Sequence, residues 1–403
     1  MANKMRIAYF SPLNPVKSGI SDYSEEILPF LNSYFDIDLF IDPSWEPENS
    51  EIRNKFNIIP FNTESFDSSK YDEIVYHMGN DYKAHKFIYE SLMKYPGIVV
   101  LHDLVLQGFY AERYDETRDF DSYKRLLVKN YKQKGVQIAE RVRLKLPNQI
   151  WESEKAIDYP LNEEVLKAAK AVVVHSEFVK DRVCLKTDNP VTKINQHGYI
   201  NKKFDVENTR KNLGLEKKDI LICSAGFINK NKRYERILSA LSEIKEFRFK
   251  YLIAGKDRGR LLDNYLNGTE SYIIKLGHLP IEKVEEILNA SDICINLRYP
   301  TMGESSASLL RMMGYAKPTL ITDYGSYAEF PDYCAVKISP DIDEKEMIKR
   351  TVTALALDKD FRLSMGREAK NFVEQECSIK KCAQEYAGFI KSLQKKRAKN
   401  AGE

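Results

Sequence analysis

Short apolar runs recur along the chain, and longer amphipathic stretches separate them. The runs are apolar toward both sides, which is typical of strands buried on both faces of a parallel sheet. We expect strands at 6–10, 36–41, 73–76, 98–101, 171–174, 220–223, 250–254, 272–276, 293–297 and 319–322. The stretches between them predict helices, because apolar residues such as Ile20, Tyr23, Ile27 and Leu31 fall on one helical face. The alternation predicts an α/β fold with two doubly wound sheets.

The domain boundary is expected where the strand signal stops. Residues 201–219 are polar and highly charged, and they predict a hinge. We therefore expect a Rossmann-like domain at 1–200, a second at 201–380, and a C-terminal helix with a frayed basic tail at 381–403. We expect the last helix, from Ile379 to about Gln394, to pack on one of the two domains, and the sequence leaves open which one. Ligands of such folds bind outside the carboxyl ends of the strands, so the loops after strands are the places to search.

Composition narrows the class of protein. The 403 residues are too many for one ordinary core, and 62 Lys and Arg against 59 Asp and Glu leave a net charge of +3. This balance argues against a dedicated nucleic-acid binder. The six cysteines form no CxxC pair, which indicates neither a zinc site nor a disulfide framework and favours a reducing cytoplasm. The start shows no signal peptide, and no apolar run is long enough to span a bilayer.

Two loops carry features that suit an anion. Residues 11–22 follow the first strand and open a helix near Gly19, where free amides attract anions. This loop matches neither a dinucleotide fingerprint nor a P-loop, and an ordinary turn explains it equally well. In residues 225–234, Lys230, Lys232 and Arg233 precede a helix, so their charge adds to the helix dipole. Such a site suits a diphosphate leaving group; the alternative is a solvated basic loop.

The most specific loop is 296–311. A strand ends there, the chain turns, and Ser305 or Ser306 is placed to cap the next helix. The arrangement sets Glu304 at the helix mouth, where a carboxylate can accept sugar or ribose hydroxyls. The amides of Ser305 and Ser306 are expected to face a phosphate. The alternative for Glu304 is a simple capping role, and the surrounding loop favours function.

Histidines follow several of the expected strands. His102 ends a strand at the cleft with Asp103 beside it, which favours a functional role. His77 ends another strand, and Asn80 and His85 are expected to line the same cleft on the acceptor side.

Other candidates favour structural roles. His175 and His197 also follow strand-like runs, where a hydrogen-bonded structural histidine is the better interpretation. The Asp-x-Asp patterns at 36–38 and 341–343 fall in a strand and a surface turn, so we reject both as metal sites.

Together these segments resemble the retaining glycosyltransferases of the GT-B fold, family four (the group 1 type), over nearly the whole chain. The resemblance rests on SPLNPVKSGISDYSEEILP, YHMGN, VVLHDLVL, VVVHSEF, NQHGY, AGFINKNKRYERIL and LGHLPIEKVEEILNASDICINLRYPTMGESSASLLRMMGYAKPTLITDYGSYAE. It implies two facing Rossmann-like domains, with the nucleotide-sugar donor bound by the C-terminal one and the acceptor by the N-terminal one. It also implies a reaction that needs no metal and no other cofactor.

The resemblance assigns roles by position. Lys232 matches the lysine that neutralises the donor diphosphate, and Gly19 matches the glycine loop that closes over it. His102 matches the histidine that positions the transferring sugar through its backbone or ring. Residues 276–280, which include Gly277, His278 and Leu279, match the stretch whose backbone reads the base.

The chain departs from the family pattern at two places. Phe227 stands where the family has an arginine. Aligned on residues 317–318, the second glutamate of the family's E-x7-E pattern falls at Arg311, and the first falls at Gly303 with Glu304 one place later. We expect Glu304 to hold the donor sugar and Arg311 to stand at the nucleotide position, which leaves ribose recognition open.

Residues 124–145 contain eight Lys or Arg and one acidic residue, Glu140, interleaved with apolar residues. A basic amphipathic segment can lie on anionic lipid or gather a polyprenyl-diphosphate acceptor. A solvated helix face is an equally good explanation.

The expected function is a retaining, metal-independent transfer from a nucleoside-diphosphate sugar to a glycan or lipid-linked acceptor, in polysaccharide or glycolipid assembly. The expected location is cytoplasmic, with peripheral contact at the membrane inner face and no nucleic-acid partner. The alternative from another class is a catalytically silent GT-B subunit that binds a partner transferase or a glycan. A sugar-nucleotide epimerase or a phosphorylase is a nearer rival, against which the spacing around Glu304 argues.

Overall fold

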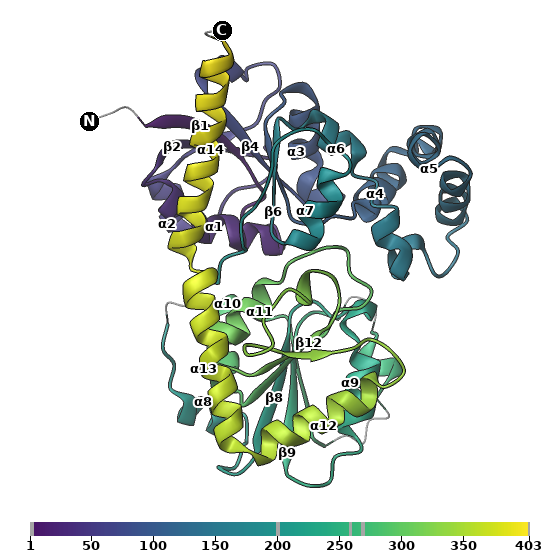
Figure 1. Ribbon diagram of the computed structural model, residues 1–403, viewed down its shortest axis with the longest axis vertical. Coiled ribbons are helices and arrows are strands. Elements are labelled where there is room, and N and C mark those ends of the chain that lie inside the picture. Colours follow the sequence, from purple (N-terminus) through teal and green to yellow (C-terminus); the bar gives the residue numbers. More distant parts are fainter. Residues whose placement is uncertain (1–3, 199–201, 258–259, 267–270, 402–403) are drawn as a thin grey trace. The chain divides into compact units, whose positions relative to one another are not determined.

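The computed structural model describes residues 4–198, 202–257, 260–266 and 271–401, which form two compact units (Figure 1). The first unit comprises Met1–Gln196, Met302–Ser305 and Ile379–Glu403, and the second comprises His197–Thr301 and Ser306–Ser378. The boundary expected between residues 200 and 201 lies outside the described residues. Residues 302–305, expected in the second domain, group with the first unit.

A seven-stranded sheet of parallel strands forms the centre of the first unit, in the order β3-β2-β1-β4-β5-β6-β7. Its strands are β1 (Met5–Phe10), β2 (Phe35–Ile41), β3 (Asn57–Pro60), β4 (Glu73–Met78), β5 (Ile98–Leu101), β6 (Ala171–Val174) and β7 (Val191–Lys193). Sequence reasoning missed β3 and β7. Both are short edge strands whose residues are half-buried or exposed, so they lack the continuous apolar run of the central strands.

Helices cover both faces of this sheet. The helices of the first unit are α1 (Gly19–Leu31), α2 (Ser50–Lys55), α3 (Tyr82–Lys94), α4 (Gln107–Thr117), α5 (Phe120–Arg143), α6 (Glu163–Ala168), α7 (Glu177–Cys184) and α14 (Ile379–Ala401), with short 3-10 turns at Ser68–Lys70, Ile150–Glu152 and Glu154–Asp158. Of these, α5 packs against α4. Along β1 the side chains alternate, so Tyr9 lies under α1 and α14 while Phe10 packs toward α3.

The last helix therefore packs on the first unit, one of the two expected alternatives. It continues to Ala401, beyond the end expected near Gln394.

Helix α5 is a helical hairpin, visible beside the sheet of the first unit in Figure 1. The chain breaks at Lys132, whose φ of 48° and ψ of −128° are not helical. The two arms touch closely, because a Cβ at Gly135 would lie 2.1 Å from the carbonyl oxygen of Leu127. The single amphipathic segment expected at 124–145 is thus two short helices, which pack closely where Gly135 has no side chain.

The second unit is built on a six-stranded parallel sheet in the order β10-β9-β8-β11-β12-β13. Its strands are β8 (Ile220–Ala225), β9 (Phe249–Ala254), β10 (Ile273–Gly277), β11 (Ile293–Asn296), β12 (Thr319–Thr322) and β13 (Val336–Ile338). Its helices are α8 (Val206–Asn212), α9 (Tyr234–Leu241), α10 (Ile281–Ala290), α11 (Ala307–Gly314), α12 (Glu344–Leu357) and α13 (Lys359–Glu376), with 3-10 turns at Lys230–Lys232, Leu262–Asn264 and Gly325–Tyr327. The edge strand β13 was not expected, and the other strand ends differ by at most two residues from those expected.

Apolar side chains of the second sheet point alternately to its two faces. Ile222 and its neighbours pack on α9 and α12, whereas Cys223 packs on α10 and α11. Both faces are thus covered by helices, and the carboxyl ends of β8 and β11 lead into the loops before α9 and α11. These loops hold the candidate residues.

Candidate active site

Lys232 is a buried cation at the carboxyl end of β8. It ends the 3-10 turn Lys230–Lys232, and its side chain is only 6% exposed. Its Nζ donates a hydrogen bond to the carbonyl oxygen of Ala225 at 2.9 Å. The alternative for residues 225–234, a solvated basic loop, therefore does not hold for Lys232, whereas Lys230 is exposed. An ammonium removed from water is stabilised by an anion more strongly than an exposed one.

The next residue, Arg233, forms an ion pair within the protein. Arg233 adopts a left-handed conformation with φ of 59° and its guanidinium pairs with Glu344, the first residue of α12. Its Nε lies 3.0 Å from Glu344 Oε1. Arg233 therefore fixes the start of α9 against α12, and its charge is neutralised within the protein.

Helix α11 begins beside Lys232. Ser306 caps the helix by accepting the Leu309 amide at 3.3 Å, as expected, and such a cap contributes about 1 kcal/mol. Asn296, at the end of β11, donates to Ser308 Oγ at 3.0 Å, and Ser308 lies 3.1 Å from Ser306 Oγ. Asn296 and Ser308 were not singled out from the sequence, although both lie in the loop-helix segment that was.

Lys232 and Ser308 approach each other beside Gly226. A Cβ at Gly226, whose φ is +103°, would lie 2.7 Å from Lys232 Nζ and 3.8 Å from Ser308 Oγ. The ammonium and the hydroxyl therefore lie close to the same bare stretch of backbone. A cavity of about 10 Å³, the space of roughly one water, borders Lys232 and Asn296. A lysine ammonium and a serine hydroxyl near the start of a helix are groups of the kind that bind anions, and the role of Lys232 toward a donor diphosphate stays a prediction.

Glu304 lies in the segment that groups with the first unit. It is buried, and its Oε2 accepts the Met302 amide at 2.7 Å, so it does stabilise its own loop. Ser305 beside it is half-buried. The roles of Glu304 in holding the sugar and of the Ser305 amide in facing a phosphate stay predictions.

Arg311 is buried in α11 and pairs with Glu285 of α10, with Nε to Oε1 at 3.3 Å. Its side chain therefore already has a carboxylate partner inside the second unit. A role for Arg311 in contacting the nucleotide stays a prediction.

The expected base-reading stretch follows β10. Gly277 and His278 are exposed and Leu279 is half-buried. Gly277 has φ of +66°, and nothing lies within 4 Å of a Cβ built on it. Gly19, the first residue of α1, is equally open, with Ser18 capping the helix through the Ile20 amide. Both glycines leave backbone accessible, as contact with a ligand would require.

Three buried histidines form a hydrogen-bonded chain in the first unit. His77 is the last residue but one of β4, and His102 and His175 directly follow β5 and β6, the next two strands of the sheet. His77 Nδ1 lies 2.9 Å from His102 Nε2, and His102 Nδ1 lies 3.3 Å from His175 Nε2. The ring of Tyr23, from α1, packs edge-on against His102 at 4.9 Å. The sequence marked His102 alone as functional, yet three histidines ending consecutive strands were a signal that they meet.

The acceptor-side candidates gather around Gly79. The Asn80 amide donates to Asp103 Oδ2 at 2.9 Å, and Asn80 Oδ1 accepts the Phe109 amide at 2.9 Å. A Cβ at Gly79 would lie 3.1 Å from the His85 ring and 3.2 Å from Asp103 Oδ2. The structure thus brings Asn80, His85 and Asp103 together, while their contact with an acceptor stays a prediction.

In the first Asp-x-Asp pattern, which was rejected as a metal site, Asp38 is held by other side chains. Asp38 in β2 binds Arg6 at 2.8 Å and accepts from Asn57 and Tyr71. In the described ranges, no group of three His, Cys, Asp or Glu side chains is placed to hold a metal ion. None of the helices described is both long and apolar enough to cross a membrane.

Known proteins resemble this chain in sequence. Residues 205–372 match the family model described as glycosyl transferases group 1. The uncharacterized glycosyltransferase MJ1069 of Methanocaldococcus jannaschii is 28% identical over 248 residues, which are 59% of this chain and 62% of that protein. The alignment thus covers less than two thirds of that relative's length.

Solved structures share the fold over nearly the whole chain. Sucrose-phosphate synthase of Thermosynechococcus elongatus has a TM-score of 0.67 at 13% identity, covering 97% of this chain and 99% of its own. HepE of Anabaena, in complex with UDP and glucose, has a TM-score of 0.64 at 14% identity, covering 96% of this chain and 100% of its own. WaaG, a glycosyltransferase involved in lipopolysaccharide biosynthesis, has a TM-score of 0.62 at 14% identity, covering 95% of this chain and 99% of its own. The expected GT-B fold is confirmed. The sequence match to glycosyl transferases group 1 covers residues 205–372, and the likeness of fold covers nearly the whole chain.

Proposed function

We propose that the protein is a retaining, metal-independent glycosyltransferase that moves a sugar from a nucleoside-diphosphate sugar to a glycan or lipid-linked acceptor. The observation that carries this proposal is the buried Lys232 beside Gly226 and Ser308. The donor reaction leaves a nucleoside diphosphate, whose negative charge grows as the glycosidic bond breaks. A fixed ammonium and a helix N-terminus stabilise that charge without a metal ion.

The comparisons support this choice of ligand. The family match spans residues 205–372 and so includes Lys232 and the start of α11. HepE, which shares the fold, was solved with UDP and glucose and with UDP-glucose. We therefore assign donor binding to the second unit and acceptor binding to the loops of the first, with Asn80, His85 and Asp103 on the acceptor side.

Donor binding tests the proposal directly. A ligand that binds only the native state stabilises it by about 2.7 kcal/mol at a hundred times its Kd, so thermal unfolding with UDP-, GDP- and ADP-sugars identifies the donor. Lys232→Met is expected to abolish the shift in melting temperature, and Lys211→Met, an exposed lysine of α8, is the charge-matched control. An unchanged shift in Lys232→Met would reject the anion site. A product with the donor's anomeric configuration supports retention.

A catalytically silent subunit is the second candidate. Arg311 stands where the family has a glutamate, and it is held by Glu285 inside the second unit. This alternative predicts ligand binding without turnover. Product analysis across the same sugar nucleotides separates the two, since transfer or donor hydrolysis by the purified protein excludes a silent subunit.

We also propose a peripheral membrane contact through the α5 hairpin. Most apolar residues of 124–145 pack on the first unit's core, and Glu140 forms ion pairs with Lys124 and Arg143. What remains for a lipid surface is the exposed basic side and Leu144, which is 59% exposed. The contact is therefore mainly electrostatic, with a small apolar component.

A further inference from the structure

The hydrogen bonds along the chain of three histidines all run in the same direction. The carbonyl oxygen that accepts the last of them fixes this direction. His175 Nδ1 lies 2.8 Å from the carbonyl oxygen of Ile194. A carbonyl only accepts hydrogen bonds, so the proton of His175 is on Nδ1 and its Nε2 is an acceptor. His102 Nδ1 must then donate to His175, which leaves His102 Nε2 as the acceptor for the Nδ1 proton of His77. All three rings are the same tautomer.

Burial keeps His77 neutral, and its two partners in the chain are buried as well. His77, His102 and His175 are 1%, 8% and 9% exposed. Removal from water lowers the pKa of His77 well below its ordinary value, and the neighbouring His175 and His85 add to the effect. As long as His77 carries its proton on Nδ1, an extra proton on Nε2 of His102 or of His175 would set two N–H groups against each other. The remaining lone pair, on His77 Nε2, has no hydrogen-bond partner among the described residues.

The surroundings leave the rings little freedom. His77 borders a cavity of about 10 Å³ whose other walls are mostly apolar and include Tyr9 of β1 and Tyr386 of α14. Tyr23 contacts all three imidazoles, with ring centroids 4.9 to 5.7 Å away. The backbone of His102 is also held, because its amide donates to the carbonyl of Met78 at 2.9 Å.

We propose that His77 and His175 are positioning residues for His102. By occupying both ring nitrogens, they fix the ring and the turn that carries Asp103, and they leave no ring N–H of His102 for a ligand. The participation of His102 rests on the proposed function. The chain of tautomers does not, and it is measurable without a substrate.

The first test is nitrogen-15 NMR of the histidine side chains at pH 7.5. The wild type is expected to show His77, His102 and His175 as neutral Nδ1–H tautomers. A charged His102, or an Nε2–H tautomer at that residue, overturns the proposal. His197→Asn, in the second unit and outside the chain, is expected to leave the His102 resonances in place and serves as the control for losing a buried histidine.

The second test uses pairs of matched variants. Asn presents an N–H at the position of Nδ1, whereas Leu has the same branched skeleton without it, so His77→Asn retains the donor that His77→Leu lacks. In the same way, the side-chain oxygen of His175→Gln replaces the Nε2 acceptor, and His175→Met does not. The His102 tautomer is expected to persist in the Asn and Gln variants and to become a mixture in the Leu and Met variants.

Turnover should follow the tautomer. A small misplacement of a catalytic group costs up to about 100-fold in rate. We expect kcat to fall roughly 10- to 100-fold in His77→Leu and His175→Met with little change in the donor KM, and to recover in His77→Asn and His175→Gln. Equal kcat in Asn and Leu variants overturns the positioning role. If the wild type transfers no sugar, the proposed function fails, and the NMR of the same variants still decides whether His77 and His175 hold the ring.

Discussion

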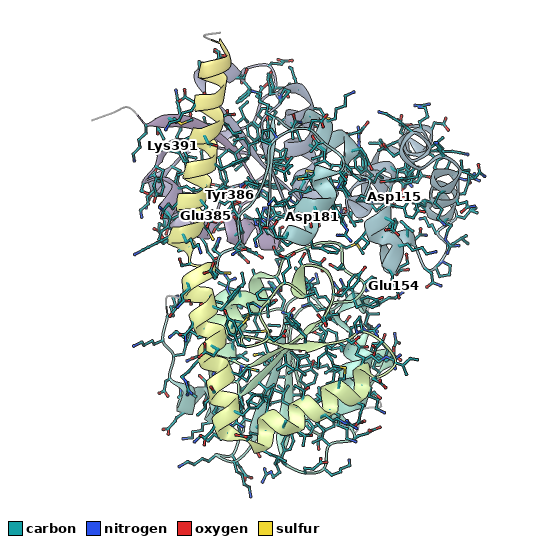
Figure 2. The ribbon with its side chains drawn as sticks, in the orientation of Figure 1. Asp115, Glu154, Asp181, Glu385, Tyr386 and Lys391 are labelled. Carbon is teal, nitrogen blue, oxygen red and sulfur yellow. The ribbon has the colours of Figure 1, made fainter. Side chains whose placement is uncertain are left out.

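The hydroxyl oxygens of Tyr23 and Tyr386 lie 2.8 Å apart, although 363 residues separate them in the sequence. Tyr23 belongs to α1 and Tyr386, labelled in Figure 2, to α14. Burial raises the pKa of both phenols well above the ordinary value, so both keep their protons, and one donates to the other. Because the Tyr23 ring also packs on the histidines, this hydrogen bond connects the last helix to the candidate site.

A double-mutant cycle measures that connection. Tyr23→Phe or Tyr386→Phe alone leaves a buried hydroxyl without its partner and is expected to lower the free energy of unfolding by about 1–3 kcal/mol. The double variant removes both hydroxyls and should lose less than the sum of the two. Urea unfolding of the four proteins gives the coupling energy. Strict additivity would show that the two hydroxyls do not interact.

Stability should fall in mild acid. Burial lowers the pKa of His77 and of His85, so the folded protein leaves these rings neutral where the unfolded chain protonates them. Their contribution is present above about pH 6.5, the ordinary histidine pKa, and is lost as pH falls from there toward the lower folded-state value. Each strongly shifted histidine removes about 1.4 kcal/mol per pH unit in that range.

Unfolding by urea at pH 7.5, 6.0 and 5.0 checks this pH dependence. The groups that face His77 are Tyr9, Tyr23, His85, His102 and His175. None of them is a carboxylate that would stabilise an imidazolium. His77→Asn is therefore expected to lose stability less steeply below pH 6.5, and a slope identical to that of the wild type would contradict the assignment.

Glu304 can be tested for charge separately from capping. Glu304→Ala is expected to abolish transfer while the protein stays folded. In Glu304→Gln the amide oxygen can still accept the Met302 N–H, so the loop should keep its shape while the charge is lost. Steady-state kinetics with circular dichroism distinguish the roles. Full activity in Glu304→Gln would limit Glu304 to hydrogen bonding, and full activity in Glu304→Ala would remove it from the site.

The ion pair of Arg311 and Glu285 predicts a compensation. Arg311→Met leaves a buried carboxylate without its guanidinium, which costs about 3–5 kcal/mol. The double variant Arg311→Met/Glu285→Gln removes both charges and is expected to regain most of that loss. Denaturant unfolding measures the stability, and nucleotide affinity of the double variant tests the ribose role. Affinity equal to that of the wild type would exclude Arg311 from donor binding.

Binding of the α5 hairpin to anionic vesicles should depend on salt. Flotation with vesicles that contain anionic lipid is expected at low salt and should decrease at high salt, because ions screen the attraction. Lys129→Gln/Lys145→Gln should weaken it, whereas Lys217→Gln/Lys218→Gln, in the second unit, is the charge-matched control. Equal flotation with neutral vesicles, or in both double variants, would contradict an electrostatic contact at the hairpin.

The sequence predicted those parts of the fold whose cause is local. The apolar run 98–101 is β5 to the residue, and the helix expected near Gly19 begins there. The edge strands β3, β7 and β13 were not predicted, because each is only three or four residues long and has no continuous apolar run. The hairpin of α5 escaped because its break at Lys132 depends on packing between two arms, which a helical period does not record.

The sequence singled out individual residues of the candidate site but not the contacts between them. The positions of Lys232 and Ser306 followed from loop spacing, and the structure explains them by burial and capping. The contact of His102 with His77 and His175 required the order of the strands in the sheet. Sequence reasoning predicted a hydrogen-bonded structural histidine at 175. The ring is hydrogen-bonded to the Ile194 carbonyl, but the sequence did not reveal that the same ring contacts His102.

The return of α14 to the first unit makes the second unit an insertion within it. Apart from residues 302–305, the second unit is one continuous stretch, His197–Ser378, whose two ends are tied by the Gly198 amide and the Cys377 carbonyl at 2.8 Å. Its ends are thus adjacent, as in domains that tolerate excision or circular permutation. A fragment of residues 197–378 should therefore fold alone, whereas residues 1–196 expose the apolar face that α14 covers and should require that helix to be supplied as a separate peptide.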